Sequence, residues 1–281
     1  IHSRGVVQRW RAARDEHDTR EFQQVLTEAT SPDVRVRARI SEKTVLLVAS
    51  FGAFLAFLDA TIVNVAFPNI RESFPDAGID ELSWILNAYS IVFAAFLVVS
   101  GRLADLVGRR RTFTNGVLIF TIASVLCGLA QDISQLVAFR LLQGVFGACL
   151  VPLSQAVLLD SHPRERHASA MALWGVGVMV GPILGPTLGG WLTEHLSWRW
   201  VFYINLPVGI LAWLGLAAFV QETPLDRGRR FDGVGFGLLV LAIGAFQMML
   251  DRGESHGWFE SVEIVVEALL AALALYLFVV H

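Results

Sequence analysis

Two ionisable residues, Asp59 and Arg140, lie inside long apolar runs of the sequence and are the first candidates for chemistry. Asp59 interrupts the run at 45–66, and Arg140 lies within the run at 136–159. If these runs cross a bilayer, each charge costs at least about 2.5–3.5 kcal/mol there, which marks a functional residue by default. An aspartate in such a place can hold or release a proton, because burial and a nearby arginine change its proton affinity in opposite directions. The pair indicates proton coupling or, alternatively, a static salt bridge that fixes helix packing.

Amide side chains interrupt the apolar runs at further positions, namely Asn64, Gln143, Gln155, Asn205 and Gln247. Of these, Asn64, Gln143 and Gln155 are candidates for polar residues of an internal cavity. Any of the five could instead join helices by hydrogen bonds. Both cysteines, Cys127 and Cys149, lie in apolar runs, so we interpret them as packing residues and expect no metal site.

Eight apolar runs are long enough to carry these residues across a membrane, since a spanning helix needs about 20 residues. They are 45–66, 82–100, 112–130, 136–159, 168–192, 200–220, 233–250 and 264–280. The last two are shorter and weaker, so a buried or re-entrant segment is the alternative for them. The chain is 54% hydrophobic and 17% charged, whereas a soluble domain carries about 25% charge. The sequence therefore predicts an all-α polytopic membrane protein.

The distribution of Lys and Arg predicts the orientation of these spans. Connections on one side hold thirteen Lys and Arg residues, and the alternating connections hold three, Arg71, Arg199 and Arg252. The richer side faces the cytoplasm, which places the N-terminus inside and the protein in the plasma membrane, or the inner membrane of a Gram-negative cell. Asp59 then lies roughly 21 Å from the inner edge, and Arg140 roughly 6–9 Å below the outer edge. These depths are comparable, so the two side chains can meet if their helices are neighbours.

The two ends of the sequence differ from the apolar runs. Residues 1–43 are polar and Arg-rich, which favours a cytoplasmic tail. A stripe of Phe22, Val25, Leu26 and Ala29 leaves a membrane-surface helix as the alternative. The chain opens on Ile1 rather than Met and stops at the end of a predicted span, so both ends are typical of a piece of a longer protein.

Four segments, in order, resemble signature motifs of the major facilitator superfamily. They are LDATIVNVAFPNI (58–70), GRLADLVGRRR (101–111), RLLQGVFGA (140–148) and GPILGPTLGG (181–190). More narrowly, the sequence from about residue 44 to 281 is similar to the fourteen-helix drug:proton antiporters of the EmrB/QacA type. The resemblance implies a six-helix N-terminal half at 44–221, built from two inverted three-helix repeats. It further implies a cytoplasmic linker with two extra transmembrane helices at 222–281, and a C-terminal half that is absent from these residues.

The same resemblance implies roles for individual residues. It assigns proton coupling to Asp59 and Arg140, with Gln143 and Gly144 completing the motif at Arg140. It also implies a cytoplasmic latch between the transporter halves, formed by Gly101, Asp105, Gly108 and Arg109, although Leu106 stands where the family frequently has Arg. Gly108 suits a helix cap or tight turn, and Asp105 can pair with arginines.

A glycine stripe marks the fifth apolar run, where Gly177, Gly181, Gly185 and Gly189 recur every four residues. Small residues at this spacing let a partner backbone approach closely, and Pro182 and Pro186 permit a kink. The stripe is either a static packing seam or a bendable face on which two halves move. The resemblance identifies it as the antiporter motif and implies that it packs against a helix of the absent second half.

These observations together predict a secondary transporter that exports drugs or other amphipathic compounds by substrate/proton antiport. Alternatives are an exporter of a lipid, peptide or metabolite, and a non-transporting truncated membrane protein or interaction module. The expected partners are bilayer lipid, protons, a small-molecule substrate and the missing C-terminal half, without nucleic acid. We expect no cofactor, because the proton gradient supplies the energy. An enzyme is disfavoured, because the polar cluster near the end of the fourth run has no recognisable nucleophile setting; it comprises Ser154, Asp160, Ser161, His162 and His167.

Overall fold

A computed structural model describes residues 42–220, 222 and 232–281. The chain divides into two compact units, residues 1–44 and 45–281. The tail with its predicted Phe22–Ala29 stripe, and most of the linker after residue 220, lie outside the described residues.

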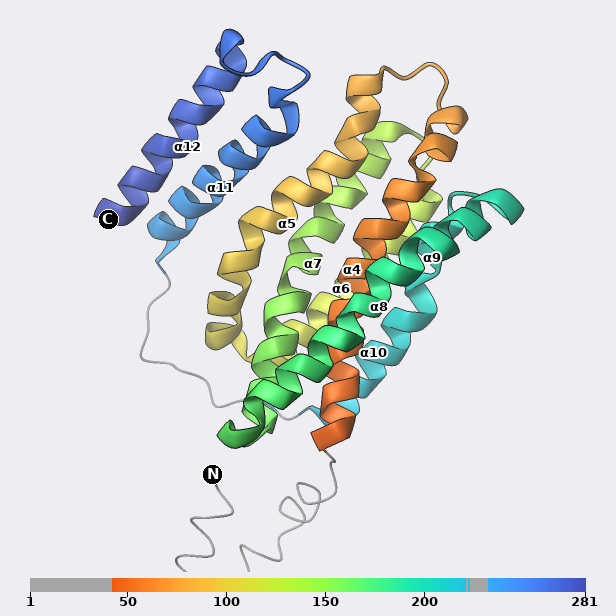
Figure 1. Cartoon of the computed structure of the whole chain (residues 1–281), viewed down its shortest axis with the longest axis vertical. Helices are drawn as coiled ribbons and strands as arrows, with labels where there is room; N and C mark the ends of the chain where they lie inside the picture. Colours follow the sequence, from red (N-terminus) through yellow and green to blue (C-terminus); the bar gives the residue numbers. More distant parts are fainter. Residues whose placement is uncertain (1–41, 221, 223–231) are drawn as a thin grey trace, which may run out of the picture. The chain divides into compact units, whose positions relative to one another are not determined.

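Eight spans in the described part of the chain are long and apolar enough to cross a membrane, as predicted. Six of them are single α-helices, the fifth joins a short 3-10 helix (Arg164–Arg166) to an α-helix, and the sixth joins two α-helices (Figure 1). The last two are full spans of 21 and 19 residues. The helices are α4 (Glu42–Ser73), α5 (Ile79–Val107), α6 (Arg109–Leu129), α7 (Ile133–Ser161), α8 (His167–His195), α9 (Trp200–Tyr203) with α10 (Asn205–Phe219), α11 (Gly233–Gly253) and α12 (Val262–Val280). Most of these helices extend past their apolar runs. Their polar end turns stay helical, since helical backbone hydrogen bonds do not depend on apolar side chains.

Helices far apart in sequence lie side by side in the bundle. The helix α7 packs along both α5 and α6, and α10 packs against α6. The helices α11 and α12 form an antiparallel hairpin (Figure 1). This hairpin contacts α5 through the rings of Phe96 and Phe236, whose centroids are 5.8 Å apart in an edge-to-face arrangement.

Two short turns fix where the central helices begin. Gly108 separates α5 from α6 with φ 110°, a backbone conformation that favours glycine, and its N–H donates to the Ala104 carbonyl at 2.8 Å. The predicted helix cap at Gly108 is therefore confirmed. At the other end of the bundle, Asp132 caps α7 by accepting the Gln135 N–H at 2.8 Å. These turns set the register of α6 and α7, which carry most of the polar residues described below.

The sixth span is interrupted between α9 and α10, where the sequence predicts one continuous run. Pro207 explains the interruption, since it has no N–H to donate to the carbonyl of Tyr203 and its ring crowds that carbonyl. The helix α9 ends at Tyr203, and α10 begins at Asn205. The interruption places a polar amide, Asn205, in the buried interior of the bundle.

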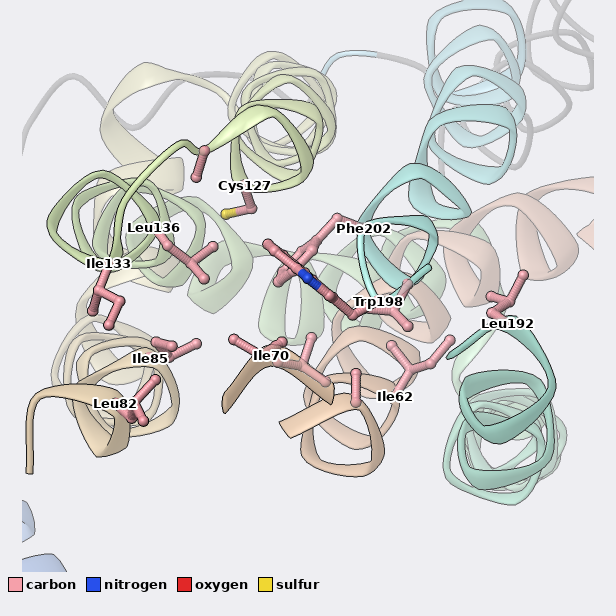
Figure 2. Packing of buried hydrophobic residues seen from close by; sticks show 14 residues of the cluster. Ile62, Ile70, Leu82, Ile85, Cys127, Ile133, Leu136, Leu192, Trp198 and Phe202 are labelled. Carbon is pink, nitrogen blue, oxygen red and sulfur yellow. The ribbon is translucent and has the colours of Figure 1, made fainter. Parts of the chain in front are cut away.

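An apolar cluster fills one end of the bundle and draws on α4 to α9 (Figure 2). It includes the fully buried Ile62, Ile85, Leu136 and Phe202. Cys127 belongs to the same cluster, and both Cys127 and Cys149 are buried free thiols, which confirms their interpretation as packing residues. Because Ile85 and Phe202 also offer backbone carbonyls to the polar site, the cluster seals that site on one side.

Candidate functional site

Asp59 on α4 and Arg140 on α7 form an ion pair inside the bundle. The Arg140 Nη1 lies 2.6 Å from the Asp59 Oδ2, and the side chains are 2% and 0% exposed, respectively. The contact expected from their comparable depths is therefore present. Taking two charges out of water is expensive, and it is offset only where their remaining hydrogen-bonding atoms are also satisfied.

The second oxygen of the Asp59 carboxylate accepts two more hydrogen bonds. Its Oδ1 accepts from the Gln143 Nε2 at 2.8 Å and from the Asn205 Nδ2 at 2.8 Å. Arg140, Gln143 and Asn205 all donate to the carboxylate, so the arrangement is that of an ionised aspartate. Hydrogen bonds to the charged form stabilise that form.

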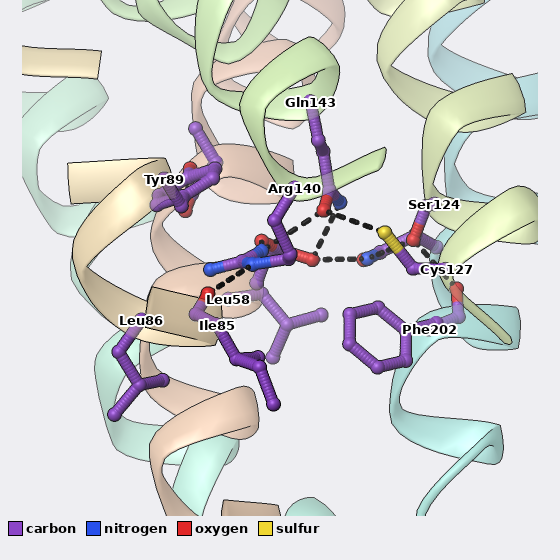
Figure 3. Close-up of polar contacts among 12 residues, drawn as sticks. Leu58, Ile85, Leu86, Tyr89, Ser124, Cys127, Arg140, Gln143 and Phe202 are labelled. Carbon is purple, nitrogen blue, oxygen red and sulfur yellow. Dashed lines mark hydrogen bonds and ion pairs between the residues drawn. The ribbon is translucent and has the colours of Figure 1, made fainter. Parts of the chain in front are cut away.

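Arg140 is held from three sides (Figure 3). Its Nε donates to the Ile85 carbonyl at 3.1 Å, and its Nη1 also donates to the Gln143 Oε1 at 2.9 Å. The guanidinium carbon lies 3.9 Å from the centroid of the Tyr89 ring, a cation–π geometry. Gly144 permits this packing, since a Cβ there would lie 2.8 Å from the Tyr89 carbonyl oxygen. The helices α5 and α7 thus fix the cation opposite Asp59.

Two residues that the sequence analysis did not single out as site residues, Ser124 and Asn205, complete the network. The Asn205 Nδ2 donates to the Ser124 Oγ at 3.0 Å, and Ser124 in turn donates to the Phe202 carbonyl at 2.9 Å. Ser124 and Asn205 are both 0% exposed. Asn205 was one of five interrupting amides, and the signal that separates it from the others is Pro207, two residues later. Ser124 carries no such signal, because serines are common in membrane helices.

The predicted cavity residues behave differently from one another. Gln143 belongs to the network, whereas Asn64 is exposed on α4 and Gln155 is half-buried on α7. Within the described part of the chain, neither Asn64 nor Gln155 hydrogen-bonds to Asp59 or Arg140.

The two glycines of the predicted latch lie on or next to α5, where Gly101 is half-buried and Gly108 caps the end of the helix. Arg109 forms the charged part, with one nitrogen 3.0 Å from Asp105 and another 2.7 Å from Asp160 at the end of α7. These side chains are 29–39% exposed, so each pair contributes at most about 1 kcal/mol. These ion pairs join α5, α6 and α7. Asp160, which the sequence analysis had placed in the polar cluster near the end of the fourth run, is one of the partners.

The glycine stripe of α8 packs against α4, and the expected packing against a helix of the absent half stays a prediction. A Cβ on Gly181 would lie 3.0 Å from the backbone nitrogen of Leu58, and one on Gly189 would lie 3.0 Å from Ile62. Gly177 and Gly185 face Ser50 and Thr61 of the same helix. Glycine spacing shows how closely a backbone can approach, but it does not identify the partner. The helix α8 continues through both Pro182 and Pro186.

The polar cluster near the end of α7 is occupied by structural contacts. Ser154 accepts the Trp174 indole N–H at 3.0 Å, and Asp160 pairs with Arg109. The rings of His162 and His167 lie 2.9 and 3.0 Å from backbone carbonyls. Among the described residues, no group of three His, Cys, Asp or Glu side chains could hold a metal ion.

The spans and the buried ion pair define a class: a multi-pass helical membrane protein with an ionisable site inside the bundle. The chain belongs to the Major Facilitator Superfamily, whose family model matches residues 49–280. This confirms the family expected from the motifs, and with it the fold class.

Relatives within the superfamily agree with the narrower resemblance to EmrB-like proteins. The multidrug export protein EmrB of Escherichia coli is 36% identical over 236 residues, which cover 83% of this chain and 46% of the relative. The fatty acid resistance protein FarB of Neisseria gonorrhoeae is 39% identical over 237 residues, covering 84% and 46%. The chain therefore spans about half the length of these curated relatives. Both are members of a transporter family rather than enzymes.

Among solved structures, the human organic anion transporter MFSD10 has a similar fold. Its TM-score is 0.59 at 20% identity, over 73% of this chain and 55% of the other. At this identity the likeness extends to the fold alone.

Proposed function

We propose that the whole protein is a secondary transporter that exports amphipathic compounds in exchange for protons. The proposal rests chiefly on one observation, the ion pair of Asp59 and Arg140 buried within the predicted spans. Membrane-embedded ion pairs are expensive, and those that persist commonly serve proton or ion movement. The EmrB relationship supports drug-like compounds as the substrate class.

In this proposal Asp59 alternates between a charged and a neutral state. Uptake of a proton cancels the attraction to Arg140, so the helices α4 and α7 lose their strongest mutual contact. Because Asp59 is 0% exposed here, a proton reaches it only after the bundle opens. Proton binding and opening of the bundle are then coupled, since opening lets a proton reach Asp59 and a neutral Asp59 favours the open bundle.

The glycine stripe of α8 provides a surface along which α4 can move when Asp59 changes charge. Gly181 and Gly185 contact α4 immediately beside Asp59, at Leu58 and Thr61. Without side chains between them, α4 can shift along α8 when Asp59 changes charge. We propose that this is the function of the antiporter motif, with Gly177, Pro182, Pro186 and Gly189 shaping the same face.

The arrangement in the membrane is also proposed. The Lys and Arg distribution supports a cytoplasmic N-terminus in the plasma membrane. Residues 44–221 would form the N-terminal six-helix half, with the helices of 222–281 following it and a C-terminal half as the partner. The Asp105–Arg109–Asp160 pairs would then stabilise the cytoplasmic end of the first half and release it during opening.

Exchange in proteoliposomes tests the transport proposal. The whole protein is reconstituted, a proton gradient is imposed, and ethidium serves as the amphipathic probe. Wild type should accumulate ethidium against its gradient, and Asp59→Asn should abolish gradient-driven transport. Asp251→Asn is the matched control, because this carboxylate lies on α11 beside Gln247, outside the network.

A stability control separates lost coupling from lost folding. The double variant Asp59→Asn/Arg140→Gln removes both charges, so no ion is left unpaired, and it should still fail to transport. Full transport by Asp59→Asn would remove the proton role. If wild type moved no probe under any gradient, a non-transporting membrane protein would be the better account.

A second substrate class is favoured by FarB, whose name describes fatty acid resistance. An exporter of long-chain fatty acids would use the same proton site with an anionic amphipathic substrate. Oleate tested beside ethidium in the same vesicles distinguishes the two classes, since the preferred substrate should inhibit transport of the other at lower concentration.

A further inference from the structure

We propose that Asn205 is the positioning residue that detects the proton on Asp59 by reversing its side-chain amide. The amide donates to the ionised carboxylate and, after reversal, accepts from the neutral carboxylic acid. This inference rests on the proposed protonation of Asp59 and adds a residue on the sixth span to it.

The orientation seen in the structure matches an ionised Asp59. The Asn205 Nδ2 uses its two hydrogens for the Asp59 Oδ1 at 2.8 Å and the Ser124 Oγ at 3.0 Å. The Asn205 Oδ1 is buried and has no hydrogen-bond partner among the described residues. A buried carbonyl without a donor is unfavourable. The Asn205 amide is thus held through its Nδ2 hydrogens, while its Oδ1 accepts no hydrogen bond among the described residues.

Protonation of Asp59 changes the kind of hydrogen-bonding partner that its carboxyl group needs. A carboxylic acid donates one hydrogen bond, so Asp59 then requires an acceptor where its Oδ1 now meets two donors. Gln143 is already engaged, because its Oε1 accepts from the Arg140 Nη1 at 2.9 Å. The unpartnered Oδ1 of Asn205 is the available acceptor, and a half-turn of the amide exchanges it with the Nδ2.

Ser124 can follow this reversal. Its hydroxyl now donates to the Phe202 carbonyl at 2.9 Å. When the Asn205 oxygen replaces the nitrogen, the hydroxyl rotates and donates to that oxygen instead. The Nδ2 then takes the position without a partner, so each orientation leaves one amide atom unsatisfied. The reversal also takes the Ser124 hydroxyl from the Phe202 carbonyl, so the reversed orientation is the less favourable one while Asp59 is ionised. The hydrogen bond that the neutral Asp59 donates must supply the difference.

The reversal has a consequence for the backbone of the sixth span. Rotation of the Ser124 hydroxyl removes a donor from Phe202, in the short helix that ends before the α9–α10 interruption. Asn205 itself is the first residue after that interruption. The proton state of Asp59 on α4 is thereby linked to the α9–α10 interruption in the sixth span. The charged or titratable side chains facing this network are Asp59 on α4, Tyr89 on α5, Cys127 on α6 and Arg140 on α7.

Infrared difference spectroscopy on the whole protein in lipid tests the inference without any transport substrate. Acid-minus-neutral spectra should contain a carboxylic acid C=O band that Asp59→Asn removes. A carboxylic acid that donates a hydrogen bond absorbs at lower wavenumber than a free one. Asn205→Leu, which keeps the size of the side chain but has no acceptor, should therefore move the Asp59 band to higher wavenumber. Asn115→Leu, at an exposed position on α6, should leave it in place.

The outcomes separate this inference from the proposed function. An Asp59 band that is unmoved in Asn205→Leu overturns the reversal and leaves the proton role intact. The absence of any Asp59-dependent band in wild type overturns the proton role itself. If Asn205→Leu does not fold, NMR of the wild-type protein with labelled asparagine side-chain amides replaces it, and the Asn205 signal is assigned by its loss in Asn205→Ser. The Asn205 amide protons should shift with the same midpoint pH as the Asp59 band, and an unchanged amide would contradict the reversal.

Discussion

The Asp59–Arg140 pair should show a large energetic coupling in a double-mutant cycle. In Asp59→Asn the guanidinium of Arg140 stays buried but loses its anionic partner and keeps only neutral acceptors, namely the Ile85 carbonyl, the Gln143 amide oxygen and the amide oxygen of the substituted side chain. Breaking a buried pair by removing one partner costs about 3–5 kcal/mol. Arg140 cannot escape by losing its proton. We expect Asp59→Asn to lower the free energy of unfolding by roughly that amount.

The reverse single variant should be milder. In Arg140→Gln, Asp59 keeps the donors Gln143 and Asn205, and it can take up a proton instead of staying charged. In the double variant neither charge remains, so most of the loss should be recovered. The cycle should give a coupling energy of about 2–3 kcal/mol, well above the additive limit of about 0.5 kcal/mol.

Unfolding of the whole protein in mixed micelles, followed by tryptophan fluorescence and circular dichroism, measures each variant. Additive losses in the two single variants would refute the reasoning, since they would mean that the buried charges do not stabilise each other. An equal loss of unfolding free energy in both single variants, combined with strong coupling, would contradict only the expectation that Asp59 takes up a proton when Arg140 is removed.

The same unfolding assay tests three further contacts. Gly181→Ala should lose about 1–3 kcal/mol, because its Cβ would be forced against the α4 backbone. Gly190→Ala, with open space around it, should be neutral or stabilise by up to about 1 kcal/mol, and equal effects would argue against the seam. Ser154→Ala should lose about 1–3 kcal/mol by leaving the Trp174 indole N–H without its acceptor, and no loss would show that the indole finds another. Gly108→Ala should lose about 1–3 kcal/mol to backbone strain at φ 110°, so an unchanged midpoint would mean that the turn adjusts.

The spans and the central ion pair were predictable from the sequence because both follow from the membrane as solvent. Apolar length determines where a helix can cross, and depth along two antiparallel spans determined that Asp59 and Arg140 could meet. The cap at Gly108 was predictable for a local reason, since a glycine between two helical patterns suits a turn.

The partners of the network were less predictable because they depend on lateral packing. Nothing in the spacing of Gly177 to Gly189 identifies α4 as a partner, and the family resemblance had implied only a helix of a second half. Asn205 was visible only as one interrupting amide among several. Its place beside Asp59 depends on the α9–α10 interruption and on how α10 packs against α6.

Proton release on ligand binding tests the central claim most directly. The whole protein in weakly buffered detergent is mixed with whichever probe it transports, and a pH indicator follows the solution. Wild type should release protons as the probe binds, because in the proposed mechanism substrate binding favours the charged state of Asp59 and a proton favours the neutral state. The Asp59→Asn/Arg140→Gln variant should bind the probe and release none. Equal proton release by that variant would contradict the claim that Asp59 carries the exchanged proton.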